Sequence, residues 1–336
     1  RRLAPPAAAA TRGQPAPSAG VLHLRGAAEH NLKGIDVEIP LQRLVCITGV
    51  SGSGKSTLLH DVLYPALRRL QGQGDLPVGR HAGIDGWEQL GEVVLIDQSP
   101  IGKTSRANPA SYVGALDGIR KLFAREPLAK SRRYTAGTFS FNSGKGRCPT
   151  CGGTGFEHVE MQFLADVYLR CPDCDGKRYR APVLEVTYRE HSIADVLALT
   201  VDAAAGFFAD QPAIVRQLAP LQAVGLGYLT LGQPVPTLSG GEAQRLKLAG
   251  HLAKTGSGRR RRSDGGATKT PLLLFDEPTT GLHFADIACL LQTFARLLRE
   301  GDDTKELSIL VEGRIALTEH IAGRGGIALV IGTTGF

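Results

Sequence analysis

A glycine-rich segment with the spacing of a phosphate-binding loop lies near the start of the chain. It reads GVSGSGKS and fits the pattern GxxxxGK[ST] in full. Its residues are Gly49, Val50, Ser51, Gly52, Ser53, Gly54, Lys55 and Ser56, and Thr57 follows them. Glycines let successive backbone N–H groups point at a phosphate, and a helix that begins there adds the positive end of its dipole. In that arrangement Lys55 reaches the terminal phosphates and Ser56 holds Mg²⁺, so the segment predicts a nucleotide site.

An acidic pair after an apolar run supplies the complementary chemistry. The run Leu272–Phe275 is followed by Asp276 and Glu277. A buried strand there would deliver Asp276 to the Mg²⁺ shell and place Glu277 where it can orient or deprotonate an attacking water. A strand that ends in Asp-Glu is common, and it is the phosphate-loop pattern that favours the catalytic interpretation.

A third segment combines a helix start with uncovered backbone donors. It consists of Leu238, Ser239, Gly240, Gly241 and Glu242, with Gln244 close behind. Ser239 and Glu242 fit a capping box, which by itself indicates only a well-capped helix. The two glycines leave N–H groups uncovered, so this helix start is also suited to a γ-phosphate that another phosphate loop holds.

Four of the six cysteines form two CxxC pairs with the pattern of a metal site. The first pair is Cys148 and Cys151, and the second is Cys171 and Cys174. The two pairs are separated by 19 residues. This spacing is typical of a structural Zn²⁺ site with four thiolates and no open position, and four unligated thiols are the alternative.

Basic and aromatic residues are interleaved around these cysteines. The basic residues expected to face DNA are Lys145, Arg147, Arg170, Lys177 and Arg178. The aromatic residues are Tyr134, Phe139, Phe141 and Tyr179. Cations would neutralise phosphates while the rings contact bases or pack the small module, but a solvated basic face has the same composition.

The elements that must position these groups are readable from hydrophobic periodicity. Apolar runs at 44–48, 93–96 and 272–275 predict buried strands of a sheet that is covered on both faces. Helical patterns follow the phosphate loop and recur at 111–124, 192–199, 213–224 and 239–253, and residues 156–170 alternate as in a hairpin. The fold class is therefore α/β, with a P-loop core that contains an inserted, mostly helical domain.

Composition excludes several classes of protein. The 336 residues include 39 Lys and Arg against 32 Asp and Glu, and this charge of +7 permits a polyanionic partner without demonstrating one. No window approaches the roughly 18–20 apolar residues of a membrane span, no signal peptide is recognisable, and six cysteines are too few for a disulfide scaffold. We therefore expect a cytoplasmic protein. Because the chain starts at Arg1 and its sole methionine is Met161, we also expect a piece of a longer polypeptide.

The order of these motifs resembles the C-terminal half of UvrA, a member of the ABC-type ATPase superfamily. LSGGE with Gln244 is similar to the ABC signature, and Gln98 stands where the family has its Q-loop glutamine. Further matching segments are Asn31-Leu32-Lys33, GVSGSGKSTL at 49–58, IDQSPIG at 96–102, Asn108-Pro109, FSFN at 139–142, GLGYL at 225–229, LGQP at 231–234, TLSGGEAQRLKLA at 237–249 and DEPTTGLH at 276–283.

The resemblance implies an ATPase that recognises damaged double-stranded DNA in bacterial nucleotide excision repair and the SOS response, and that loads the next subunit without cutting DNA. ATP would lie between the phosphate loop of one module and the signature of another. Lys55, Gln98, Asp276 and Glu277 would then serve one site, and residues 238–244 would act in trans at a second. The implied cofactors are ATP, Mg²⁺ and one structural Zn²⁺. The implied partners are DNA, the N-terminal ATPase half of the parent chain, a second copy of that chain and a UvrB-type subunit, with no membrane.

Composition, periodicity and the resemblance together predict a domain organisation. Residues 1–20 would be a flexible linker, and 21–100 and 251–336 the two parts of the ATPase core. Residues 101–250 would be the signature-domain insertion, with its zinc module at 138–182. Within the second core part, residues 255–270 are expected to form a basic loop and 301–336 an atypical tail.

One departure from the family concerns the strand after DEPTTGLH, which in the family ends in Glu-His. Here the run Ile309–Glu312 is followed by Gly313, and the nearest Glu-His pair is Glu319-His320. This departure and the basic loop motivate an alternative function, a UvrA-like ATPase in drug self-resistance or stress outside the excision pathway. A transporter subunit would share the signature, but the cysteine pairs argue against it.

Overall fold

The computed structural model describes residues 20–102, 106–142, 144–159, 167–256, 269–279, 284–299, 308–312 and 329–332. The chain divides into two compact units. The first unit consists of Arg1–Asp97, Gly265–Thr279 and Phe294–Phe336, and the second of Gln98–Asp264 and Thr280–Thr293. The expected linker, basic loop and tail, with Glu319-His320, lie largely or wholly outside the described residues.

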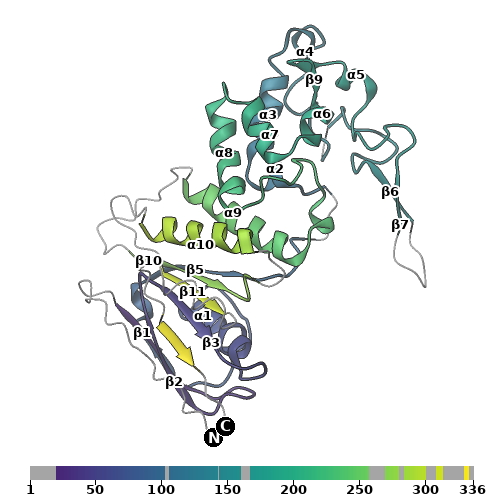
Figure 1. The fold of residues 1–336 in the computed structure, drawn as a ribbon. Helices are drawn as coiled ribbons and strands as arrows, with labels where there is room; N and C mark the ends of the chain where they lie inside the picture. The colour runs from purple at the N-terminus through teal and green to yellow at the C-terminus, as the bar shows by residue number, and fades with distance from the viewer. Residues whose placement is uncertain are drawn as a thin grey trace, which may run out of the picture. The chain divides into compact units, whose positions relative to one another are not determined.

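The first unit contains a sheet of five parallel strands in the order β12–β3–β11–β10–β5 (Figure 1). The strands are β3 (Leu44–Thr48), β5 (Leu90–Ile96), β10 (Thr270–Phe275), β11 (Ser308–Glu312) and β12 (Leu329–Gly332). The three predicted strands are confirmed, and every residue of β3 is buried. Because the carboxyl ends of parallel strands meet at one edge, the residues after β3, β5 and β10 and the last residue of β11 gather there.

A second sheet of this unit is antiparallel, in the order β2–β1–β4. Its strands are β1 (Val21–Ala27), β2 (Ile35–Pro40) and β4 (Gly83–Asp85). Leu24 lies opposite Val37 in the β1–β2 register, and both are buried. The sequence analysis did not predict this sheet, although the alternation in β1, with Leu22 and Leu24 buried, is the period-two pattern of a half-buried strand.

The helix after the phosphate loop begins with a π-helical segment, η1 (Thr57–Leu63), and continues as α1 (Tyr64–Leu70). Its apolar side chains enter one core with both sheets of the unit. Those of η1 are Leu58, Leu59, Val62 and Leu63, which the sequence analysis placed on a helix. A short 3₁₀ turn, η2 (Trp87–Gln89), leads into β5.

The second unit is mainly helical. Its helices are α2 (Pro109–Tyr112), α3 (Ala115–Phe123), α4 (Pro127–Ser131), α5 (Ala181–Leu184), α6 (Ile193–Ala198), α7 (Val201–Phe207), α8 (Pro212–Ala223) and α9 (Gly240–Gly256), with a 3₁₀ turn η3 (Val235–Thr237). Helix α10 (Phe284–Arg299) is shared by the two units. The predicted helix at 111–124 is interrupted at Gly114, whose φ of 84° ends α2 and begins α3. Among the described residues, no helix is long and apolar enough to cross a membrane.

Two short hairpins complete the second unit. Strands β6 (Phe156–Val159) and β7 (Val167–Arg170) pair antiparallel, as the alternation at 156–170 predicted. Strands β8 (Thr187–Tyr188) and β9 (His191–Ser192) form the other pair.

Candidate nucleotide and metal sites

The phosphate loop, Gly49–Ser56, connects β3 to η1 at the carboxyl edge of the parallel sheet. Gly54 has a φ of 90°, and a Cβ there would lie 2.8 Å from a methyl carbon of Leu32, so the position requires glycine. Asn31 donates a hydrogen bond from Nδ2 to the Gly52 carbonyl at 2.9 Å. The Asn31-Leu32 segment therefore packs against the phosphate loop and fixes its backbone.

Lys55 is turned back over this loop. Its Nζ donates to the Val50 carbonyl at 3.2 Å, and 10% of its side chain is exposed. Its Nζ also lies 4.0 Å from Glu312 Oε1. A largely buried ammonium at a glycine-rich loop is suited to bind terminal phosphates.

Asp276 follows β10, and its backbone N–H donates to the Ile96 carbonyl at the end of β5. His60, on η1, places Nε2 at 2.8 Å from Asp276 Oδ2. This hydrogen bond raises the pKa of His60 and outweighs burial, which lowers it. The structure therefore holds Asp276 between two strands and the helix of the phosphate loop.

Glu312, the last residue of β11, lies in the same place. Ser56 Oγ donates to Glu312 Oε1 at 2.9 Å, and only 1% of the Glu312 side chain is exposed. Burial and the Asp276 carboxylate raise the pKa of Glu312, while Ser56 and Lys55 lower it. Two carboxylates, a hydroxyl and an ammonium thus converge at the sheet edge.

The remaining catalytic candidates are Glu277 and Gln98. Glu277 adopts a φ of 41°, in the left-handed region that side chains other than glycine rarely occupy. Such strain often marks a functional position. Gln98 belongs to the second unit, where a Cβ on Gly240 would lie 3.2 Å from its Oε1. The structure therefore places Gln98 beside the signature segment, Leu238–Glu242.

The signature segment begins α9 with the predicted capping box. Ser239 N donates to Glu242 Oε2 at 2.8 Å, and Glu242 N donates to Ser239 Oγ at 3.3 Å. Tyr228 OH donates to Glu242 Oε1 at 2.7 Å, and Arg245 donates to Tyr228 OH at 3.3 Å. Ser239 and Gly240 are exposed at this helix start. Gln244 is only 2% exposed, and its role in the signature segment stays a prediction.

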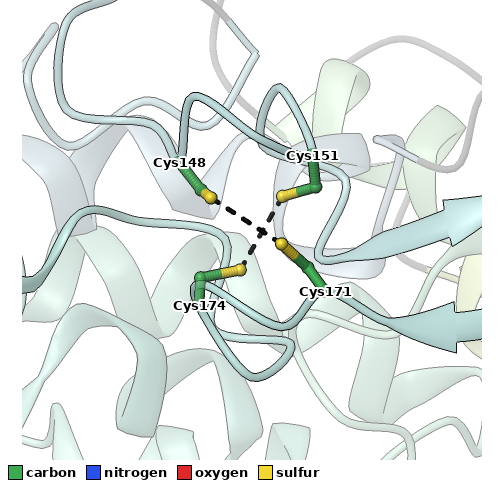
Figure 2. A group of neighbouring side chains, drawn as sticks. All are labelled: Cys148, Cys151, Cys171 and Cys174. Atoms are coloured by element: carbon green, nitrogen blue, oxygen red, sulfur yellow. Dashed lines mark hydrogen bonds between the residues drawn. The ribbon is translucent and has the colours of Figure 1, made fainter.

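The cysteine cluster, Cys148, Cys151, Cys171 and Cys174, gathers its sulfur atoms between the loop before β6 and the loop after β7 (Figure 2). All four sulfur atoms lie within 4.8 Å of one another. The Cys148–Cys171 and Cys151–Cys174 sulfur distances are 3.9 and 3.7 Å. A tetrahedral Zn²⁺ with Zn–S bonds of about 2.3 Å separates its ligands by about 3.8 Å, so the spacing suits a four-thiolate metal site.

Backbone geometry shapes this cluster and its thiol acidity. A Cβ on Gly153, whose φ is 89°, would lie 2.0 Å from the Phe141 carbonyl oxygen, so the turn after Cys151 can close only with glycine. Burial raises the pKa of Cys174 to about 12. Burial also acts on Cys151, but backbone N–H donors at Gly155 and Gly153 outweigh it and lower the pKa of that thiol to about 7.

The basic residues near the cluster divide into exposed and buried groups. Lys145, Arg170 and Lys177 are exposed, and Arg147 is half-buried. Arg178 corrects the prediction of a DNA-facing residue, because only 6% of it is exposed. Its guanidinium packs over the Phe141 ring at 5.0 Å and donates to the Gly232 carbonyl at 2.9 Å.

The interleaved aromatic rings pack the module. Phe139, Phe141 and Tyr179 are all at most 1% exposed. Tyr179 OH donates to the Phe139 carbonyl at 3.0 Å. Of the two roles considered for these three rings, the structure supports packing.

Three residues of these sites were not predicted from the sequence: His60, Glu312 and Tyr228. Glu312 ends an apolar run, the same signal that identified Asp276. His60 lies one helical turn beyond Ser56, on a segment that was interpreted only for its apolar face. Tyr228 lies in the segment GLGYL, which was considered only as part of the resemblance.

Comparisons with known proteins agree with this geometry. No protein-family model matches the chain. It is 47% identical over 327 residues to UvrABC system protein A of Methanothermobacter thermautotrophicus, covering 94% of this chain and 32% of the relative. It is 52% identical over 281 residues to UvrABC system protein A of Thermus thermophilus, covering 84% of this chain and 28% of the relative. The chain thus spans about a third of the length of these curated relatives.

A solved structure gives the same result. The crystal structure of UvrA2 from Deinococcus radiodurans superposes with a TM-score of 0.75 at 46% identity. The match covers 90% of this chain and 34% of that one. An α/β ATPase fold with a four-cysteine cluster is therefore established for the chain.

Proposed function

The chain belongs to the UvrA family, of whose members it spans about a third, and on this premise we propose that it is one ATPase module of the DNA-damage-recognition subunit in nucleotide excision repair. The observation that carries the proposal is the convergence of Lys55, Ser56, Asp276 and Glu312 at the carboxyl edge of the sheet, directly after a complete phosphate-loop motif. The subunit binds and hydrolyses ATP and does not cut DNA.

Lys55 and the loop backbone bind the terminal phosphates of ATP. The Lys55 ammonium exchanges its contact with the Val50 carbonyl for phosphate oxygens, which offer a charge-assisted bond. Glu277 orients or deprotonates the attacking water, and its left-handed backbone suits a fixed catalytic position. Gln98 senses the γ-phosphate, and its place beside Gly240 would connect that sensing to the signature segment.

Ser56 and Asp276 hold Mg²⁺ in this proposal. The residues fit a divalent cation, because hydroxyl and carboxylate oxygens are its preferred ligands and a buried oxygen of Glu312 has no hydrogen-bond partner among the described residues. Mg²⁺, when bound, neutralises charge on the transferred phosphoryl group. Asp276 is held for this purpose by His60.

The signature segment acts in trans on a second nucleotide. Its exposed Ser239 and Gly240 lie at the N-terminus of a 17-residue helix, where backbone donors and the dipole favour a γ-phosphate. The capping box fixes the position of Ser239, because the Ser239 N–H and hydroxyl both donate to the Glu242 carboxylate. The partner module would be the N-terminal ATPase half of the same parent chain, and two parent chains would form a dimer.

The cysteine cluster holds one structural Zn²⁺, and the exposed cations near it bind the phosphates of double-stranded DNA. Lys145, Arg147, Arg170 and Lys177 form this proposed surface. A UvrB-type subunit would bind elsewhere on the parent protein, in the cytoplasm. The names of the relatives favour the excision role over self-resistance.

The test is binding of lesion-bearing and intact duplexes by the full-length protein, with and without ATP. We expect preference for the lesion and a dependence of that preference on ATP. Lys55→Ala should remove the dependence on ATP, while Lys121→Ala, an exposed lysine on α3, should not. Equal binding of both duplexes under all conditions would overturn the proposal.

A further inference from the structure

Glu312 is a buried carboxylate without an adequate counter-charge. Its side chain is 1% exposed, and among the residues that the structure describes none makes a hydrogen bond to the buried Oε2. Within the described part of the chain, Glu312 forms an ion pair with Lys55, whose Nζ lies 4.0 Å from Oε1 and has a closer acceptor in the Val50 carbonyl. An ionised carboxylate in this position is costly unless a further positive charge reaches it.

The neighbours of Glu312 add to the shortage of positive charge around its carboxylate. Asp276 is close enough for its negative charge to disfavour ionisation of Glu312. Ser56 Oγ donates to Oε1 but contributes only a neutral hydroxyl. Two carboxylates and one hydroxyl therefore lie close together, with Lys55 paired to Glu312, and such oxygens are the donor set of a divalent cation site.

The order of the parallel strands places Glu312 beside Ser56 and Asp276. β11 lies between β3 and β10, and in the register Glu312 pairs with Ile47, just before the phosphate loop. The strand that carries Glu312 is thus flanked by the strand that leads to Ser56 and the strand that leads to Asp276.

We propose that Glu312 is a ligand of the divalent cation at this nucleotide site, supplying a carboxylate oxygen beside Ser56 and Asp276. The free Oε2 is the oxygen available to the cation. The inference rests on the proposed nucleotide site and adds to it a metal-binding residue outside the phosphate loop, the signature segment and the Asp276-Glu277 pair. Glu312 then also competes for Lys55 and Ser56 when the cation is absent, so it favours nucleotide binding with metal over binding without it.

The test measures metal binding directly, with Mn²⁺ as the probe. The full-length protein is loaded with a non-hydrolysable ATP analogue, and Mn²⁺ affinity is determined by electron paramagnetic resonance. Glu312→Gln keeps the shape of the side chain and should weaken Mn²⁺ binding roughly 10–100-fold. The affinity for a fluorescent ATP analogue in EDTA should stay equal or rise.

Asp276→Asn and a stability measurement separate the possible failures. If wild-type protein binds neither the analogue nor Mn²⁺, the proposed nucleotide site itself is wrong. If Asp276→Asn loses Mn²⁺ and Glu312→Gln keeps wild-type affinity, the nucleotide site stands and the role of Glu312 is overturned. Thermal unfolding in EDTA serves as the folding control, since removal of a buried carboxylate that lies beside Asp276 and is only weakly paired with Lys55 should raise the Tm of Glu312→Gln. If Glu312→Gln does not fold, Glu312→Asp is measured in the same way, and unchanged Mn²⁺ affinity together with unchanged Mg²⁺-dependent Tm would overturn the proposal.

Discussion

His60 Nε2 lies 2.8 Å from Asp276 Oδ2, and this contact joins the helix after the phosphate loop to the end of β10. Both side chains are about three-quarters buried, with 28% and 26% exposed. A carboxylate that must bind a cation is usually oriented by such a neighbour. His60 is therefore a positioning residue for the proposed Mg²⁺ site.

Replacement of His60 should loosen this orientation. We expect His60→Ala to raise the Mg²⁺ concentration needed for half-maximal binding of an ATP analogue roughly tenfold. His60→Gln should recover part of the loss because it retains a donor. His23→Ala is the control, since His23 lies on the antiparallel sheet beside Glu38. An unchanged Mg²⁺ requirement in His60→Ala would contradict the positioning role.

Two glycines with positive φ follow the two CxxC pairs and should respond differently to alanine. Gly176 has a φ of 78°, and a Cβ there would meet no atom within 4 Å, so Gly176→Ala should cost only the left-handed strain of about 1–2 kcal/mol. Gly153→Ala has similar strain and in addition meets the Phe141 carbonyl oxygen at 2.0 Å. Metal content and denaturant unfolding of both variants test this difference. Equal losses of Zn²⁺ and of unfolding free energy in the two variants would show that the contact with the Phe141 carbonyl oxygen is unimportant.

Metal removal tests the cysteine cluster as a whole. We expect one Zn²⁺ per four-cysteine cluster in freshly purified protein, and a strong chelator should unfold residues 140–180, because the hairpin and its turns are organised around the four sulfur atoms. Elemental analysis and hydrogen exchange of this segment measure the two effects. Absence of Zn²⁺ from fresh protein, or unchanged exchange after its removal, would reject the structural metal.

Arg178 and Lys177 are neighbours in sequence with opposite environments, and they should affect different properties. Arg178→Met removes the charged donor to the Gly232 carbonyl and should cost about 1–3 kcal/mol of unfolding free energy. Lys177→Met should leave stability unchanged but reduce the salt dependence of DNA binding by about one phosphate contact. Loss of DNA affinity in Arg178→Met without loss of stability would restore Arg178 to the DNA surface.

The sequence predicted those parts of the fold that depend on local pattern. Apolar runs identified β3, β5 and β10, and the spacing of small and charged residues identified the phosphate loop, the capping box of Ser239 and the cysteine pairs. These features are local because a strand, a cap or a metal knuckle needs only neighbouring residues to be recognisable.

The contacts that the sequence could not reveal join distant segments. His60 is 216 residues from Asp276, and Ser56 is 256 residues from Glu312, so both contacts exist only through the order of the parallel strands. Arg178 was misplaced because a basic residue is exposed by default, whereas its stacking on Phe141 depends on a turn with φ of 72°. The two long-range contacts thus depend on strand order, and the burial of Arg178 depends on its left-handed backbone, neither of which can be read from the local sequence.

The signature segment should depend on pH through Glu242. Burial raises the pKa of this carboxyl, but donors from Ser239 and Tyr228 outweigh it, and the pKa lies below the ordinary value of 4.5. A depressed folded-state pKa means that the stabilising contribution is fully present above the unfolded pKa and is lost as pH falls through the folded value. The start of α9 should therefore weaken below about pH 4.5 as Glu242 is protonated.

Glu242→Gln isolates this contribution. The variant keeps the size of the side chain but has no charge to lose. It should therefore be less stable than wild type at pH 7, by roughly the free energy of one charge-assisted hydrogen bond at a helix cap. Its Tm should also fall less than that of wild type between pH 5 and pH 3. Glu185→Gln provides the matched control, because Glu185 is a partly exposed carboxylate paired with Arg132 in the same unit. If wild type and Glu242→Gln lost the same Tm over this range, the carboxylate of Glu242 would not stabilise the helix start, and the Ser239 hydroxyl alone would cap α9.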